Sequence, residues 1–356
     1  MMSILIALLL VLATNNALTC SGAAVKPFAA KHNVSPAVVS GGEMTAIKYT
    51  NVGGSGSYQR VTNLISGKGT QCAVPNDFCV RSPVTVSGPL APFNADLTLV
   101  FSGPLNIYNI SVYQPSGNSP TADWKRVSRF RAGKANPENL VFMNNLGGTK
   151  SGVWDACGGA SQSYASGDFA GSVSTANEEI FHGFVPRGLD VNIMTDTPCT
   201  PSDCPGFFRG TSNVGWSGSK LFVLQFDMPG GNDNPEKPPA IWALNGEVVR
   251  SAQYGCNCRG MGGEHGAGGC GELDILENLK GKPNNGISDF KGASGSGNED
   301  YFPRPLETKV TYGVIFDTAT NQIAIQRWKN WKWPNTVSRA DIDTYLSAEA
   351  KVASLA

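Results

Sequence analysis

The sequence predicts an all-β protein, in which a small N-terminal β-sandwich is followed by a concave two-sheet β-jelly roll with a short C-terminal helix. Charged residues make up only 16% of the chain and 42 positions are glycine, a composition typical of many short strands and turns. Short apolar or alternating runs recur between turn residues, with no helical segments alternating between them. This pattern argues against a parallel βαβ fold and favours antiparallel sheets.

The N-terminal end predicts export from the cell. Residues 1–13 form an almost uninterrupted apolar run that is too short to span a bilayer, as in a secretory signal peptide. We assign residues 1–19 to this signal, with cleavage between positions 13 and 23. Export places the nine cysteines in an oxidising compartment and predicts disulfide bonds. Sequons at Asn33 and Asn109 fit a glycoprotein that is secreted and either extracellular or associated with the cell wall.

Residues 20–114 are expected to form the small sandwich as an accessory domain. Strand-like runs lie at residues 46–49, 97–101 and 107–113, with the alternation expected of half-buried strands. Cys72 and Cys79 are close enough in sequence to close a local loop. No catalytic constellation is visible in this segment, so it is either a glycan-binding module or a spacer. Residues 115–123 have linker composition and mark the domain boundary.

Residues 124–356 are expected to form the jelly roll. Their predicted strands share short length and an apolar or alternating pattern. They lie at residues 140–143, 189–194, 221–228, 240–244, 310–316 and 322–328. A final helix is predicted from Ala340, with Ser338 as its N-terminal cap.

The stretch from Gly271 to Glu277 interleaves three carboxylates with aliphatic residues and is the candidate active site. In a strand, Glu272 and Asp274 share one face, whereas Glu277 has the wrong parity. A β-bulge between Asp274 and Glu277 would return the last carboxylate to the first face. The two glutamates must then lean toward each other across a curved sheet. The alternative is an edge strand with a solvated acidic face.

Paired glutamates beside a groove predict glycoside hydrolysis. Retaining hydrolysis requires two carboxyl groups roughly 5–5.5 Å apart, one acting as nucleophile and one as acid and base. Asp274 between the glutamates would share their proton network and keep their protonation states different.

A cysteine-rich loop precedes the acidic strand. Cys256, Cys258 and Cys270 lie among glycines, with Glu264 and His265 nearby. Three thiols and an imidazole could bind zinc, but disulfides that fix the loop over the strand are favoured in an exported chain. Cys199 and Cys204 enclose a turn and could pair with each other.

Several motifs resemble known families. The run Pro-Ala-Ile-Trp-Ala-Leu (239–244) followed by Glu-Leu-Asp-Ile-Leu-Glu (272–277) resembles glycoside hydrolase family 16, whose members are jelly rolls with a Glu-x-Asp-x-x-Glu signature. The chain also resembles the fungal Tos-type cell-wall proteins, which are putative glycoside hydrolases. That second resemblance covers the whole mature chain and rests on residues 49–53, 88–92, 253–258 and 269–272.

The resemblance implies a role and a substrate. Glu272 would be the nucleophile, Asp274 the helper and Glu277 the general acid and base, acting on cell-wall β-1,3-glucan. The loop from Cys256 to Cys270 departs from typical family 16 enzymes, which leaves the bond specificity open.

A polysaccharide site also needs aromatic platforms for the apolar faces of sugar rings. Trp242 is the first candidate, with Tyr254 and Trp216 beside it, although a tryptophan on an alternating strand can equally be core. Hydrogen bonds to hydroxyl groups are expected from polar residues of the loops. These candidates are Gln253, Asn245 and Arg250.

The remaining composition limits the partners. The 28 basic and 28 acidic residues balance, which makes nucleic acid an unsuitable partner. We expect no membrane partner, no metal, no cofactor and a monomer. The predicted function is that of a secreted retaining endo-β-1,3-glucanase acting on glucan polysaccharide or oligosaccharides. The alternatives are a β-glucan transglycosylase with the same residues and a non-catalytic glucan-binding wall protein.

Overall fold

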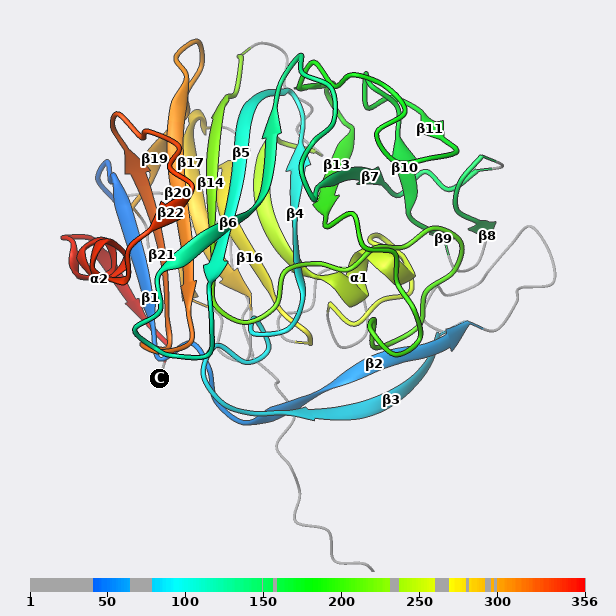
Figure 1. Cartoon of the computed structure of the whole chain (residues 1–356), viewed down its shortest axis with the longest axis horizontal. Helices are drawn as coiled ribbons and strands as arrows, with labels where there is room; N and C mark the ends of the chain where they lie inside the picture. The colour runs from blue at the N-terminus through cyan, green and yellow to red at the C-terminus, as the bar shows by residue number, and fades with distance from the viewer. Residues whose placement is uncertain are drawn as a thin grey trace, which may run out of the picture.

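Two β-sheets packed face to face form the body of the protein in the computed structural model (Figure 1). The structure describes residues 41–64, 79–148, 150–155, 159–230, 237–259, 269–279, 282–291, 296–297 and 300–355. The predicted signal peptide, Cys20, the sequon at Asn33 and Cys72 lie outside these residues. Within them the regular structure is mostly strand. The prediction of an all-β protein is therefore confirmed.

The first sheet runs in the order β22–β6–β5–β14–β20–β21–β1–β23, and β12 also pairs with β5. Neighbouring strands are antiparallel, except that β1 and β23 are parallel. The strands of this sheet are β1 (Ala46–Thr50), β5 (Leu105–Pro115), β6 (Trp124–Arg131), β12 (Phe184–Val185), β14 (Lys220–Asp227), β20 (Val310–Asp317), β21 (Gln322–Trp328), β22 (Thr336–Val337) and β23 (Lys351–Ser354).

The second sheet runs in the order β11–β10–β7–β13–β4–β15–β16–β17–β18, and β19 also pairs with β17. Its strands are β4 (Leu97–Ser102), β7 (Val141–Asn144), β10 (Ser163–Ala165), β11 (Ser172–Val173), β13 (Asp190–Met194), β15 (Ala240–Asn245), β16 (Glu272–Leu279), β17 (Lys282–Lys291), β18 (Ser296–Gly297) and β19 (Phe302–Pro303). Two separate hairpins pair β2 (Gly56–Leu64) with β3 (Cys79–Val86) and β8 (Trp154–Asp155) with β9 (Gly159–Ala160).

Alternation along the strands builds the core between the sheets. On β14, Phe222 and Leu224 face the interior cluster that both sheets share, whereas Leu221 and Val223 belong to a cluster on the opposite face. Helix α2 (Arg339–Ser347) covers that second cluster with Ile342. A strand buried on both faces in this way reads as a continuous apolar run.

Helix α2 begins as predicted. The Ser338 side chain caps it by accepting a hydrogen bond from the Asp341 N–H at 3.0 Å, which satisfies one of the otherwise unpaired donors of the first turn. Neither α2 nor α1 (Gly246–Ser251), the two helices among the described residues, has the length and apolar run needed to cross a bilayer.

The predicted division into an N-terminal sandwich (20–114), a linker (115–123) and a jelly roll (124–356) is wrong for the described residues. Strand β4 lies between β13 and β15 in the second sheet, and β5 lies between β6 and β14 in the first. The proposed linker is the hairpin loop between β5 and β6, closed by a hydrogen bond from Ser116 N–H to the Asp123 carbonyl at 2.9 Å. The strands assigned to the accessory domain thus complete the two sheets of one sandwich.

The β2–β3 hairpin is the part of the N-terminal segment that stands apart from the two sheets. It forms a long ribbon on the side of the sandwich where α1 lies (Figure 1). Its Tyr58 hydroxyl donates to Glu247 of α1 at 2.7 Å, and Arg60 forms an ion pair with the same carboxylate at 2.7 Å. These contacts fix the hairpin to the end of the second sheet.

Lys220, at the start of β14, carries a buried amino group among backbone carbonyls. Its Nζ donates to the carbonyls of Phe93 at 3.0 Å, Ala95 at 3.0 Å and Trp216 at 2.8 Å. Burial lowers the pKa of Lys220 to about 7, although the charge of Asp96 acts in the opposite direction. An unfolded lysine titrates near pH 10.4. Between these values the unfolded chain binds one more proton, so this group makes the free energy of unfolding increase with pH.

The substitution Lys220→Met should remove that pH dependence. In the unmodified chain, we expect Lys220 to raise the free energy of unfolding by on the order of 1 kcal/mol per pH unit above about pH 7. Guanidinium chloride unfolding between about pH 7 and 9 measures the slope. Lys329→Met, at an exposed position, serves as the control and should keep the original slope. Equal slopes for the Lys220 variant and the unmodified chain would contradict the expectation.

Candidate active site

The β-bulge predicted in the acidic strand is present. Along β15, Ile241 pairs with Leu276 and the next residue, Trp242, pairs with Asp274, so Ile275 is extra. The opposite neighbour agrees, since Asp274 pairs with Asp289 of β17 and Glu277 pairs with Ile287. From Asp274 to Glu277 the chain of β16 advances by three residues, whereas each neighbouring strand advances by only two. This mismatch of one residue defines the bulge.

The bulge brings the three carboxylates to one face of the sheet. Directly paired residues of antiparallel strands share a face, and Glu272, Asp274 and Glu277 pair with Leu244, Trp242 and Ala240 in turn. These three β15 residues belong to a cluster on the outer face of the second sheet. The remaining residues of the run all pack in the core between the sheets: Leu273, Ile275 and Leu276. We call Glu272, Asp274 and Glu277 the carboxylate row.

Two local features fix the start and the middle of the row. Gly271 precedes Glu272 with φ +92°, and a Cβ there would lie 2.8 Å from the Phe93 ring, so the position requires glycine. At the bulge, the Ser288 hydroxyl donates to the Asp274 carbonyl at 2.8 Å and lies 2.8 Å from the Tyr49 hydroxyl. Neighbouring buried side chains therefore hold the backbone of Asp274 in place.

Aromatic rings and a cation lie beside the row. The rings of Trp242 and Tyr254 have centroids 6.3 Å apart. The Arg259 guanidinium lies 5.5 Å from the Trp242 ring centroid and 5.7 Å from that of Tyr254. Its Nη1 forms an ion pair with Glu272 Oε2 at 3.2 Å. Glu272, Trp242 and Tyr254, which were predicted as site residues, thus meet at one point.

Asp190 of β13 orients the exposed aromatic ring. The Tyr254 hydroxyl donates to Asp190 Oδ2 at 2.6 Å, and the Ser102 hydroxyl donates to Oδ1 at 2.7 Å. Lys237 lies 4.9 Å from the Tyr254 ring centroid. Desolvation of the hydroxyl end, followed by the charge of Asp190, raises the pKa of Tyr254, so the hydroxyl stays a donor at neutral pH. The rest of the side chain is accessible, and Tyr254 is 45% exposed.

Helix α1 covers one end of this face, and Glu277 has exposed surface at the other. Val248 and Val249 of α1 pack against the second sheet over Val100, Met143 and Met194. At the opposite end, Glu277 is partly exposed. Its strand partner Ala240 pairs in turn with Ser102 of β4, and Ser102 pairs with Asp190 of β13. Asp190 accepts the hydrogen bond from the Tyr254 hydroxyl. Glu277 and Tyr254 therefore both have surface that solvent can reach.

Disulfides fix the cysteine-rich loop next to the row. Cys258 is bonded to Cys270, and Cys256 is bonded to Cys79 of β3. The zinc alternative is wrong, because the three loop cysteines are oxidised. The expected Cys72–Cys79 pair is also wrong, since Cys79 reaches across to Cys256, a partner 177 residues away. The predicted Cys199–Cys204 pair is confirmed.

Four predicted sugar contacts are buried. Trp216 packs in the core between the sheets, where its indole N–H donates a hydrogen bond to the Ser128 hydroxyl at 3.1 Å. Asn245 caps α1 by accepting from the Glu247 N–H at 2.9 Å. Gln253 is 1% exposed. We therefore correct the expectation that these side chains contact substrate.

Arg250 is the fourth, and it forms a buried ion pair. Its Nη1 lies 2.5 Å from Asp96 Oδ2, and the Arg250 side chain has no exposed surface. Burial alone would raise the pKa of Asp96, but the charge and hydrogen bond of Arg250, with the Gly215 N–H, lower it below its usual value. This arginine stabilises the packing of α1 and cannot reach a sugar hydroxyl.

Three residues of the site were not found by sequence reasoning. Arg259 pairs with Glu272, Asp190 holds Tyr254, and Asp289 faces Asp274 directly across β16 and β17. Like charges directly opposite each other destabilise a sheet. The Asp274–Asp289 pair therefore lowers stability locally, as residues at functional sites often do. Only Arg259 had a sequence signal, because it follows Cys258 in the loop that leads to Glu272.

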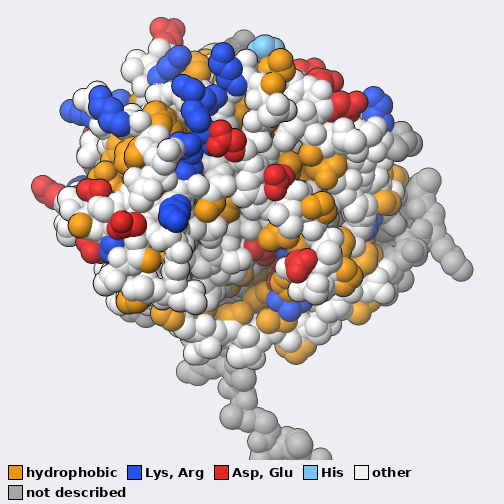
Figure 2. Space-filling view, in the orientation of Figure 1, with side chains coloured by type: hydrophobic (Ala, Val, Ile, Leu, Met, Phe, Trp, Pro, Cys, Tyr) orange, Lys and Arg blue, Asp and Glu red, His pale blue; other side chains and the backbone are white. Residues whose placement is uncertain are grey.

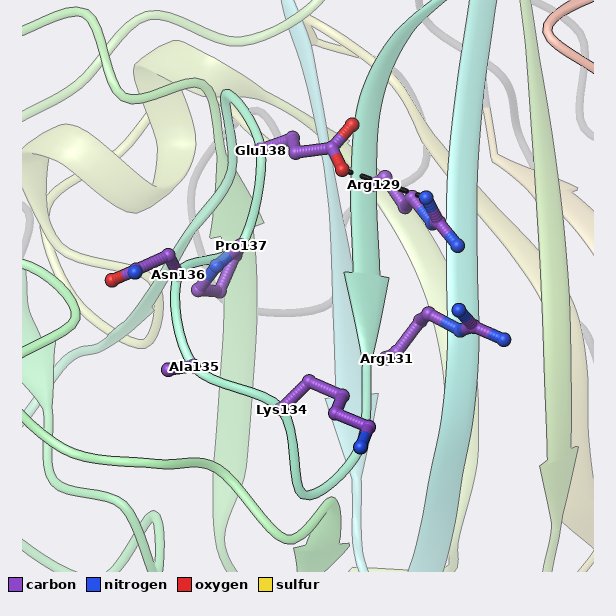
Figure 3. A pocket seen from close by; sticks show the side chains of 7 residues that line it. All are labelled: Arg129, Arg131, Lys134, Ala135, Asn136, Pro137 and Glu138. Atoms are coloured by element: carbon purple, nitrogen blue, oxygen red, sulfur yellow. Dashed lines mark hydrogen bonds and ion pairs between the residues drawn. The ribbon is translucent and has the colours of Figure 1, made fainter.

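A surface depression elsewhere on the molecule has a different character. Arg129 and Arg131 of β6, with Lys134 and Glu138 of the following loop, line it (Figure 3). Lysine and arginine side chains gather over β5 and β6 in this region (Figure 2). The depression lies on the first sheet and its lining contains no aromatic residue, so it lacks the components of a polysaccharide site.

Family models match most of the chain. "Cell wall protein YJL171C/Tos1, N-terminal" matches residues 45–115, and "Cell wall protein YJL171C/Tos1, C-terminal" matches residues 122–345. The chain belongs to the Tos1 family of cell wall proteins. The boundary between the two Tos1 models falls in the β5–β6 hairpin loop, so both parts contribute strands to the same sheets.

Curated relatives of the Tos1 type carry one shared description. A "probable circularly permuted 1,3-beta-glucanase" of Schizosaccharomyces pombe is 33% identical over 251 residues, covering 66% of this chain and 48% of the relative. The one named TOS1 in Saccharomyces cerevisiae is 26% identical over 87% of this chain and 91% of the relative. The TOS1 of Candida albicans is 37% identical over 57% of this chain and 46% of the relative. The chain thus spans about half the length of the Schizosaccharomyces pombe and Candida albicans relatives.

No solved structure matches the chain. The resemblance to glycoside hydrolase family 16 rests on the sequence motif. The Tos1 assignment rests on the family models.

Proposed function

We propose that this chain is a cell-wall β-1,3-glucanase that hydrolyses its substrate with retention of configuration. The observation that carries the proposal is the bulge that gathers Glu272, Asp274 and Glu277 on one outer face, beside Trp242 and Tyr254. Membership of a cell-wall family and the glucanase names of its relatives support β-glucan as the substrate class. Secretion by way of the N-terminal signal is part of the same proposal.

The first chemical step cleaves the glycosidic bond. Glu277, which is partly exposed, protonates the glycosidic oxygen while the Glu272 carboxylate attacks the anomeric carbon. The bond to the leaving sugar breaks, and a glucosyl ester forms on Glu272. Asp274 lies between the two in the row and shares their proton network.

The second step releases the product. Glu277 now takes a proton from water, whose oxygen attacks the anomeric carbon and breaks the ester bond. Glu277 is protonated again, Glu272 recovers its negative charge, and the sugar leaves with its original β configuration. Tyr254 presents an exposed ring on which a glucose unit can stack, and Trp242 supports that ring from the sheet side.

Release of reducing ends from a panel of glucans tests the proposal. We expect activity on laminarin and insoluble β-1,3-glucan, and little on β-1,6-linked, mixed-linkage or cellulosic glucans. Oligosaccharides longer than the starting material would show that a sugar hydroxyl replaces water in the second step, as in a transglycosylase. Binding to insoluble glucan without release of reducing ends would instead overturn the enzymatic proposal in favour of a wall protein that only binds glucan.

A further inference from the structure

We propose that Arg259 is the positioning residue for the nucleophile, holding the Glu272 carboxylate in the orientation for attack and tying it to the aromatic platform. The inference rests on the proposed function, because it assigns Glu272 the role of nucleophile. It adds a specific task for a residue outside the carboxylate row.

The contacts of Arg259 connect the chemistry to the sugar-binding surface. One guanidinium nitrogen lies 3.2 Å from Glu272 Oε2, and both side chains are less than one-tenth exposed. The same guanidinium lies within 6 Å of the ring centroids of Trp242 and Tyr254. An ion pair in such a dry environment is more strongly oriented than one in water. A cation over two aromatic rings adds further attraction.

The backbone that carries Arg259 is held in place from several directions. The Arg259 N–H donates to Asn257 Oδ1 at 2.8 Å, and Asn257 Nδ2 donates to the carbonyls of Ala252 at 2.9 Å and Gln253 at 3.0 Å. The adjacent Cys258 is bonded to Cys270, two residues before Glu272, and the Cys270 N–H donates to the Cys258 carbonyl at 2.9 Å. Arg259 and Glu272 are thus carried by segments that are covalently joined next to both residues.

This arrangement suits the charge changes of the reaction. The Glu272 carboxylate loses its negative charge when the ester bond to the sugar forms and regains it when that bond breaks. A fixed cation that stays in place through both steps stabilises the departing carboxylate without reorganisation. It also limits rotation of the carboxylate, and small misplacements of a reacting group reduce rates strongly.

A purely structural ion pair is the competing interpretation, and it predicts a different kinetic result. A structural pair affects the free energy of unfolding and leaves kcat unchanged in the folded fraction. A positioning role predicts that Arg259→Ala lowers kcat by about 10- to 100-fold. Arg259→Lys keeps the charge without the planar fork, so its kcat should lie between those of the alanine variant and the unmodified chain.

The test compares steady-state kinetics on laminarin for the full chain and both variants, with and without guanidinium ion at non-denaturing concentration. We expect guanidinium to restore part of the kcat of Arg259→Ala, because it can occupy the space of the missing group. Arg339→Ala is the matched control. It removes another partly buried ion pair, with Asp317 at 2.8 Å next to α2, and should lower the melting temperature with kcat unchanged and no response to guanidinium.

A loss of kcat with partial rescue supports the inference. Unchanged kcat in Arg259→Ala, or in Arg259→Lys if the alanine variant does not fold, would overturn the inference while leaving the proposed function intact. A lack of turnover by the unmodified chain on all β-glucans would overturn the proposed function and this inference with it.

Discussion

Replacing Glu272 with glutamine should abolish turnover of β-1,3-glucan while leaving the fold intact. The amide has nearly the same shape as the carboxylate but cannot form the glucosyl ester, so we expect kcat on laminarin to fall by about three orders of magnitude or more. Reducing-end release measures the loss, and circular dichroism and thermal unfolding check the fold.

The substitution also removes the ionic partner of Arg259, so a matched control is needed. Glu247→Gln makes the same chemical change at another buried glutamate with an arginine partner, Arg60, outside the carboxylate row. It should cost stability, because the partly buried Arg60 loses its counter-charge, but turnover in the folded protein should persist. Glu272→Gln with activity near that of the unmodified chain would remove Glu272 from the mechanism.

Replacing Glu277 with glutamine should give a different kind of loss, one that depends on the leaving group. Hydrolysis of laminarin should fall by about 100- to 10,000-fold, since general acid catalysis to the sugar leaving group is lost. An activated aryl β-glucoside of a laminari-oligosaccharide needs no protonation, so its first step should proceed and the glucosyl ester should accumulate. Added azide should then release a β-glycosyl azide and raise the rate.

Comparing the two substrates distinguishes the role of Glu272 as nucleophile from that of Glu277 as acid and base. Glu272→Gln should be inactive on both substrates and should not respond to azide. Equal losses on both substrates for Glu277→Gln, or an α-configured azide product, would contradict its assignment as the acid and base.

Local patterns in the sequence predicted the strands and the central feature of the site. The run from Glu272 to Glu277 places aliphatic residues at positions that can all pack inward only if one extra residue is inserted. Successive side chains of a strand point to opposite faces, so the face of each residue follows from its position along the strand alone. The bulge was therefore predictable from the sequence. The cap of α2 at Ser338 was predictable for the same reason.

Pairing between strands was not predictable, because it depends on contacts distant in sequence. The run at residues 97–101 reads as a strand in either one sandwich or two, and nothing in it specifies β13 and β15 as neighbours. Turn-forming residues at 115–120 suit a linker or a hairpin loop equally well. The strands β2, β3 and β17 carry charged and polar residues that hide their alternation.

Residue type alone also failed to identify sugar contacts. Trp216 and Arg250 are chemically suited to a carbohydrate site, but each faces inward, where an apolar cluster or Asp96 satisfies it. Tyr254 and Trp242 differ from them because they border the carboxylate row through Arg259. Asp190 could not be found, since its partner Tyr254 lies 64 residues later in the chain.

Covalent trapping of the nucleophile should identify Glu272 as the residue that forms the glucosyl ester. Incubation with a 2-deoxy-2-fluoro-β-laminaribiosyl fluoride should slow ester hydrolysis more than ester formation, and mass spectrometry of the digested protein should find one glycosyl group on the peptide that contains Glu272. We expect a label on Glu272 that is absent in the Glu272→Gln variant. A label on another residue, or laminarin turnover with release of an α-configured first product and no label, would contradict it.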